Sequence, residues 1–174
     1  MRCIYSMVVV AALCGCATSS GVAPTRAVSG FDGGAVIDIA PHGAACSSMV
    51  CPALGAQWTS VRPGRVIITV LVYNQIAAIT GASLSIDGKV TDLGTSLSAT
   101  TFNRPGEPLK FSSTSFGVEL STVRAIAGAK RAWVRVNTPS GYVESAIVDG
   151  DTDSKALHAM RRFLYAVDSE PVKH

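Results

Sequence analysis

The sequence has little net charge, few aromatic residues and few histidines, and each shortage narrows the functions it can carry. The formal charge is only +3 over 174 residues, so the clustered basic face of a nucleic-acid-binding protein is not expected. Aromatic residues make up 6% of the chain, which argues against a groove that stacks sugar rings. The three histidines, His42, His158 and His174, leave little material for acid–base catalysis.

Motifs of nucleophilic catalysis and phosphate binding are also absent from the sequence. It contains no G-x-S-x-G elbow, no S-x-x-K motif and no glycine-rich phosphate loop. A Ser-His-Asp set stays open, because its members can lie far apart in a sequence. A non-enzymatic role is therefore favoured, no cofactor is expected, and a hydrolytic enzyme is the third of three hypotheses.

No apolar run is long enough to form a permanent membrane-spanning helix. The apolar stretch at residues 3–13 is about half of the roughly 20 residues that a bilayer requires. Arg2 precedes this stretch and small residues follow it, which is the layout of a secretory signal peptide. The chain is therefore expected to be exported.

The end of this signal carries the most specific motif of the chain. Leu13-Cys14-Gly15-Cys16 resembles the lipobox of bacterial lipoproteins, although Cys14 stands where that pattern usually has Ala, Ser or Thr. The resemblance implies that Cys16 becomes the first mature residue and carries a diacylglyceryl thioether and an acylated amine. Three acyl chains, palmitate among them, exceed the two signals that stable anchoring needs. The alternative is a plain exported protein, cut after Ala17 or nearby.

The same resemblance suggests a location and a division of the chain. Ala17, and not Asp, follows the cysteine, which favours the outer membrane, with the domain on the periplasmic side; the inner membrane and surface exposure stay open. Residues 1–15 are expected to be the signal peptide, and residues 16–30 the lipidated cysteine and a flexible tether. Residues 31–170 would form one β-rich domain, and 171–174 a tail.

Two cysteines remain in the domain, at Cys46 and Cys51. Export places them in an oxidising compartment, so the sequence predicts a disulfide that holds a small loop. Closing a loop of this size contributes about 2 kcal/mol on the chain-entropy model. The alternative is a soft-metal site in which His42 joins the two cysteines, but no fourth ligand is near and the spacing fits no structural zinc pattern.

Hydrophobic patterning predicts an α+β fold that is mostly β. The strand predictions rest on Val, Ile and Thr enrichment, on alternation and on turn residues; they are residues 35–40, 66–73, 82–86, 116–120 and the hairpin 133–148. The run 66–73 is so continuously apolar that it predicts a central strand covered on both faces. Asp87-Gly88 predicts one hairpin turn, and the hairpin 133–148 places Arg135 opposite Glu144.

Two helices complete the prediction. Residues 121–131 begin with a capping residue and predict a short helix. The last helix is capped by Asp153 or Ser154 and has one apolar stripe, made of Ala156, Leu157, Met160, Phe163, Leu164 and Val167. The expected architecture is an antiparallel sheet or sandwich with a short internal helix and a docked C-terminal amphipathic helix. Because strands and helices do not alternate, a parallel doubly wound sheet is disfavoured.

Two charged clusters suggest ion binding, each with a simpler alternative. Asp149, Asp151 and Asp153 alternate as in the first half of a calcium loop, but Ser154 and Met160 stand where that loop needs Gly and Glu. The alternative is a polar loop whose acids favour the start of the next helix. Basic residues from Arg124 to Arg162 could meet lipopolysaccharide phosphates, but acids interleave with them and indicate a solvated mixed-charge surface.

These observations leave three functional hypotheses for a membrane-anchored envelope protein. The first is a scaffold or accessory subunit that binds another envelope protein, which an exposed sheet edge or apolar patch would favour. The second is a small-ligand or lipid-binding module, which would need an apolar cavity between sheet and helix. The third is the hydrolytic enzyme, which would need His42 or His158 beside a nucleophile and a carboxylate. No nucleic-acid partner is expected.

Overall fold

The fold is the predicted α+β class, mostly β. The computed structural model describes residues 23–103, 106 and 109–171, and within them it has ten strands and two helices. The strands are β1 (Thr25–Val28), β2 (Ala35–Gly43), β3 (Cys51–Thr59), β4 (Arg65–Tyr73), β5 (Gly81–Ile86), β6 (Lys89–Asp92), β7 (Thr101–Phe102), β8 (Phe111–Glu119), β9 (Arg131–Thr138) and β10 (Gly141–Asp149). The helices are α1 (Leu120–Gly128) and α2 (Lys155–Asp168).

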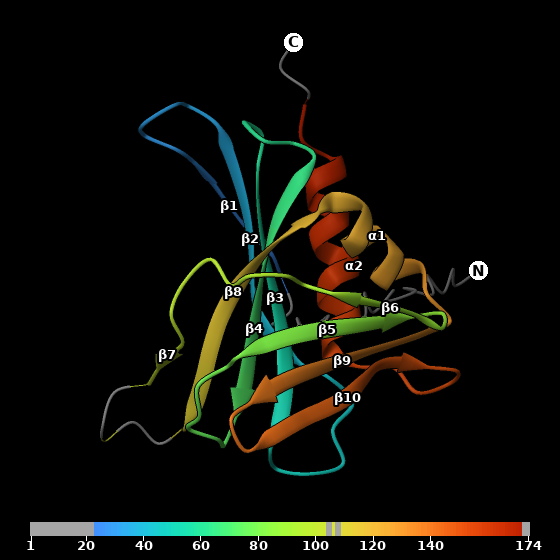
Figure 1. The fold of residues 1–174 in the computed structure, drawn as a ribbon. Helices are drawn as coiled ribbons and strands as arrows, with labels where there is room; N and C mark the ends of the chain where they lie inside the picture. The colour runs from blue at the N-terminus through green and yellow to red at the C-terminus, as the bar shows by residue number, and fades with distance from the viewer. Residues whose placement is uncertain (1–22, 104–105, 107–108, 172–174) are drawn as a thin grey trace, which may run out of the picture.

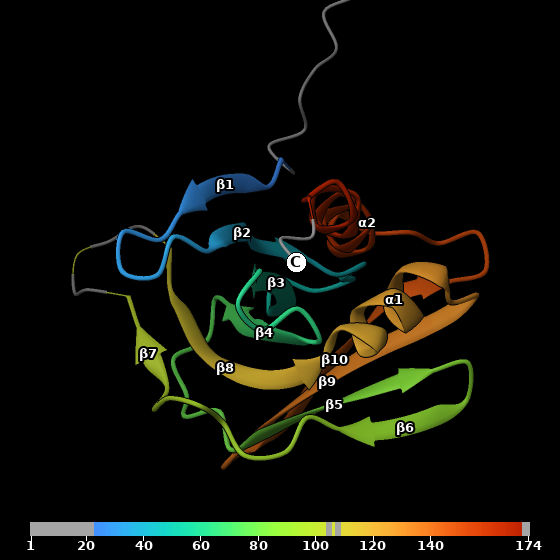
Figure 2. The ribbon, with the colours of Figure 1, turned by 90° about the horizontal axis from the view of Figure 1, so that it is seen from above.

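The strands form two antiparallel sheets (Figure 1). The larger sheet has the order β1-β2-β3-β4-β8-β7, and the smaller has the order β10-β9-β5-β6. Seen from above, the larger sheet follows a curve (Figure 2). Helix α2 packs against β2 and β3, and α1 packs against β4 and β8. Strands β9 and β10 of the smaller sheet pack against β3. These elements share one core, so they cover the inner face of the larger sheet. Within the described residues no helix or second sheet covers its outer face.

One continuous core fills the space between the two sheets and the helices. Inner-face residues of both sheets and the apolar stripe of α2 supply it, and the largest of them are Ile37, Ile39, Leu54, Ile68, Leu84, Phe116, Ile126, Ile147, Leu157, Met160 and Phe163. Every residue of the stripe predicted for the last helix is buried. That helix is therefore docked, because its apolar side can leave water only by packing on the sheet.

Local signals in the sequence placed the Asp87-Gly88 turn and the cap of α2 correctly, but the predicted cap of the first helix was wrong: α1 begins at Leu120, after Glu119, with no side-chain cap bond. Ser154 caps α2, since its hydroxyl accepts a hydrogen bond of 3.2 Å from the Leu157 amide. Asp87 and Gly88 both have positive φ, 47° and 87°, as a type I′ hairpin turn requires. The predicted helix 121–131 is shorter at its C-terminal end, because Ala129 is extended and Arg131 begins β9.

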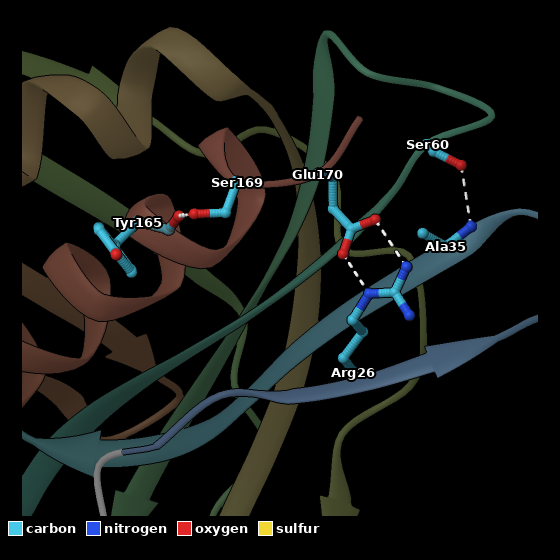
Figure 3. A network of polar contacts seen from close by, with 6 residues as sticks. All are labelled: Arg26, Ala35, Ser60, Tyr165, Ser169 and Glu170. Carbon is cyan, nitrogen blue, oxygen red and sulfur yellow. Dashed lines mark hydrogen bonds and ion pairs between the residues drawn. The ribbon is translucent and has the colours of Figure 1, made fainter. Parts of the chain in front are cut away.

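The predicted tether was wrong for residues 25–28, which form β1. This strand pairs antiparallel with β2, from Thr25 opposite Asp38 to Val28 opposite Ala35. Arg26 also forms an ion pair with Glu170, the second residue after α2 (Figure 3). All four residues of β1 are exposed, so the segment has no apolar alternation that could have revealed a strand. The folded domain therefore begins before residue 31; the earlier part of the predicted tether, up to residue 22, lies outside the described residues.

The prediction that residues 66–73 are covered on both faces was only half right. Inward-pointing residues of β4 are buried along the whole strand, but on the outer face Arg65 is exposed and Ile67 is 37% exposed. Only towards the C-terminal end is the outer face covered, where Leu71 is 8% exposed and the Tyr73 hydroxyl donates to the Pro41 carbonyl. An exposed apolar stretch therefore remains near the start of β4.

Candidate functional site

The two domain cysteines form the predicted disulfide. Cys46 and Cys51 are bonded, with their Cα atoms 5.6 Å apart, and the bond closes the loop between β2 and β3. The loop is also tied to the smaller sheet, because the Ala45 amide donates to the Ala146 carbonyl at 2.8 Å. The disulfide thus stabilises a loop that joins the two sheets.

His42 does not join the cysteines as a third ligand. Both sulfur atoms are engaged in the disulfide, so neither offers the thiolate that a metal would need. The His42 side chain is half-buried and its Nε2 has no hydrogen-bond partner among the described residues. Burial lowers the pKa of His42, and the positive charge of Lys155 lowers it further. Both effects favour the neutral imidazole.

Two of the three acids of the predicted calcium loop have partners of their own. Asp149 accepts hydrogen bonds from the indole of Trp133 at 3.1 Å and from Arg131 at 3.3 Å. Asp153 pairs with His158, whose Nε2 is 2.9 Å from its carboxylate, and Asp151 is exposed. Across residues 23–103, 106 and 109–171 no three His, Cys, Asp or Glu side chains are grouped to hold a metal ion. Asp149 therefore stabilises β9, and Asp153 contacts the first turn of α2.

The best candidate for a functional site lies elsewhere, on the outer face of the larger sheet. A groove of about 410 Å³ is hollowed there across the ends of β3, β4 and β8. Its floor contains Ile67 and Gly117, and Leu97 lies beside them. Its rim carries Asp32 from the turn before β2 and Arg62 from the turn before β4; Gln57, Thr59, Val61, Arg65 and Val66 complete the lining.

The floor of the groove is apolar because of how three segments meet. Ile67 points outward in an alternating strand, and nothing in the described chain covers it fully. Leu97, 60% exposed, is held beside β8 because its amide donates to the Ser115 carbonyl at 2.7 Å. A methyl group added at Gly117 would lie 3.7 Å from Leu97 and 3.4 Å from the Arg65 guanidinium. The missing side chain of Gly117 therefore deepens the floor.

One of the two arginines of the groove has an ion-pair partner and the other has none among the described residues. Arg65 pairs with Glu119, and both side chains are more than half exposed. Arg62 has no ion-pair or side-chain hydrogen-bond partner in the described part of the chain. Asp32 accepts a hydrogen bond from the Gly34 amide at 2.9 Å, and this bond, followed by one from Ser29, lowers the pKa of Asp32. The rim therefore carries one unpaired positive charge, on Arg62, and one carboxylate with a lowered pKa, that of Asp32.

This arrangement is suited to binding. The groove lining contains neither histidine nor cysteine, and its largest exposed side chains are apolar or positively charged. Further apolar surface lies close by, since Val61 on the rim is 55% exposed and Phe31, next to Asp32, is fully exposed. Exposed apolar side chains that gather beside polar ones are typical of an interaction site.

Sequence reasoning missed this groove, although one signal for it was present. The alternation of Arg65, Ile67 and Thr69 with buried residues marks an outward face of β4, but the high apolar content of the run obscured it. Comparison with known proteins adds no further assignment: no protein family, curated protein or solved structure matches this chain. In the described residues, neither helix is long and apolar enough to cross a membrane.

Proposed function

We propose that this protein is a lipid-anchored accessory protein of the bacterial envelope that binds another envelope protein through the outer-face groove. The observation that carries the proposal is the uncovered outer face at the start of β4, with Ile67 and Leu97 exposed beside an Arg62 that has no partner in the described residues. Exposed apolar side chains ringed by polar ones resemble the core and rim of protein interfaces. Arginine is also enriched at such interfaces.

The packed interior favours a protein partner over an enclosed small ligand. An apolar ligand would be expected between the sheet and α2, but Leu157, Met160 and Phe163 fill that space with at most 1% exposure. The groove is instead a surface hollow with polar residues on its rim. A partner's side chains can enter such a hollow while the surrounding surface contributes further contacts.

The anchor is a separate part of the proposal, and its support is the lipobox-like motif. Replacing Cys16 with Ser should abolish labelling of the protein by an alkyne palmitate analogue in growing bacteria, because the acceptor thiol is lost. Labelling would be read by click chemistry on the immunoprecipitated chain, with Cys14→Ser as the matched control that keeps its label. Unchanged labelling of Cys16→Ser would contradict the anchor.

The groove can be tested in living cells by site-specific photocrosslinking. A photoreactive amino acid at position 67 should give one abundant crosslinked protein, identified by mass spectrometry, because Ile67 lies on the floor. The matched control is the same amino acid at Tyr165, which is 78% exposed on α2. A Gly117→Ala change should weaken the position-67 crosslink, since the added methyl fills the floor without a close clash. Identical products from positions 67 and 165, or none, would overturn the proposal.

A further inference from the structure

Resting on the proposed function, we infer that the groove receives a partner segment in which an apolar side chain lies next to a carboxylate. The apolar residue would enter the floor between Ile67 and Leu97, and the carboxylate would meet Arg62. The occupant is thus an acidic peptide segment of the partner protein. Three features of the groove lead to this assignment: the size of the floor, the sign of the rim charge, and the position of Asp32.

The floor accepts a side chain and little more. Its cavity of about 410 Å³ is open to solvent along the rim, which leaves room for a leucine-sized group together with flanking backbone. The absent Cβ of Gly117 leaves room on the floor between Leu97 and the Arg65 guanidinium. Burying an aliphatic side chain here removes apolar surface of both molecules from water, so the floor supplies most of the affinity.

The rim selects the sign of the partner's charge. Arg62 is exposed and unpaired in the described residues, whereas the charge of Arg65 is already balanced by Glu119. A guanidinium binds a carboxylate through two parallel hydrogen bonds, which adds geometric specificity. Because an exposed ion pair contributes little affinity by itself, the role of Arg62 is discrimination: it favours acidic segments and repels basic ones.

Asp32 restricts where the partner's carboxylate can lie. It enters the rim from the turn before β2, where its carboxylate accepts a hydrogen bond from the Gly34 amide at 2.9 Å, and this bond, followed by one from Ser29, lowers its pKa. Arg62 belongs to the turn between β3 and β4. A partner carboxylate is therefore favoured beside Arg62 and disfavoured beside Asp32, which gives the bound segment one preferred direction.

The test is selection from a phage-displayed random dodecapeptide library on the full mature protein in detergent micelles. Selected peptides should share a Leu, Ile, Met or Phe within two positions of Asp or Glu. Their binding should weaken roughly tenfold in Arg62→Glu, through loss of attraction and added repulsion, and should fall in Ile67→Ser. Arg162→Glu is the matched control, because Arg162 is an exposed arginine on α2. The selected peptides should bind this variant as tightly as they bind the unchanged protein.

Two results would overturn the inference. One is selection of neutral or basic peptides, or of none; the other is acidic peptides that bind Arg62→Glu as well as the unchanged protein. The in-cell crosslink from position 67 separates this failure from failure of the proposed function. A crosslink that persists undiminished in Arg62→Glu would support the protein partner and refute the acidic chemistry of its segment. If neither the protein with Arg62 nor the Arg62→Glu variant gave a crosslink from position 67, the protein partner itself would be refuted.

Discussion

Single side chains join parts of this protein that lie far apart in its sequence. Arg26 on β1 donates two hydrogen bonds to the Glu170 carboxylate, one of them 3.0 Å long from Nη2, across 144 positions of sequence (Figure 3). The Glu170 side chain is only 8% exposed. In the same region the Ser60 hydroxyl accepts a bond from the Ala35 amide at 2.9 Å. Such partners cannot be predicted from sequence, because neither side chain belongs to a local motif.

The Arg26–Glu170 pair makes stability depend on pH. Hydrogen bonding and the positive charge of Arg26 lower the pKa of Glu170 below its ordinary value of 4.5. The folded state therefore binds a proton less readily than the unfolded chain. The stabilisation is present above the unfolded pKa and is lost as pH falls through the lower folded pKa.

We therefore expect Glu170→Gln to lower the melting temperature near neutral pH and to have a smaller effect at acidic pH, because the ion pair is lost as pH falls through the lowered folded-state pKa of Glu170. Thermal unfolding followed by circular dichroism at both pH values would measure this. Asp151→Asn, a change at an exposed acid, serves as the control. A difference between Glu170→Gln and the unchanged protein that is equal at both pH values would contradict the expectation.

At the scale of elements, the sequence was sufficient to predict features that depend on a few consecutive residues. The Ser154 cap, the apolar stripe of α2 and the Asp87-Gly88 turn are all readable in a few consecutive residues, and the structure confirms them. β1 could not be read in this way, because its four exposed residues form a strand only through pairing with β2. Coverage of the outer face of β4 likewise depends on distant residues such as Pro41.

Docking of α2 predicts a sharp contrast between two neighbouring positions. Leu164 is 8% exposed against the core and Tyr165 is 78% exposed. Leu164→Asp should destabilise the domain by about 3 kcal/mol or more, because a charge without a partner would enter the core. Tyr165→Asp should stay within about 0.5 kcal/mol. Urea unfolding followed by tryptophan fluorescence would measure both, and equal effects of the two changes would show that α2 is not docked.

At the scale of the whole molecule, the proposed anchor can be predicted from the sequence, whereas the groove cannot. The anchor motif occupies four consecutive residues, so the sequence alone suggests it. The groove is assembled from three strands, β3, β4 and β8, from the turns before β2 and β4, and from the segment at Leu97. No local pattern links these positions, and only the curvature and pairing of the larger sheet bring them together.

The boundary of the domain gives the last prediction. β1 covers the edge of β2, a strand of nine residues whose other edge pairs with β3. Deleting residues 23–29 while keeping Cys16 should lower the melting temperature and expose that edge. Because an open edge offers unpaired amides and carbonyls to another chain, the shortened protein should also associate as its concentration rises.

Sedimentation velocity over a range of protein concentrations, in detergent, would measure this association. Arg26→Gln is the matched control, since it removes the ion pair with Glu170 but leaves the strand in place. It should remain as dispersed as the unchanged protein, because strand pairing and not the ion pair covers the edge. If the shortened protein kept both its melting temperature and its concentration-independent sedimentation, β1 would be dispensable and the folded domain would begin after residue 30, as the sequence alone suggested.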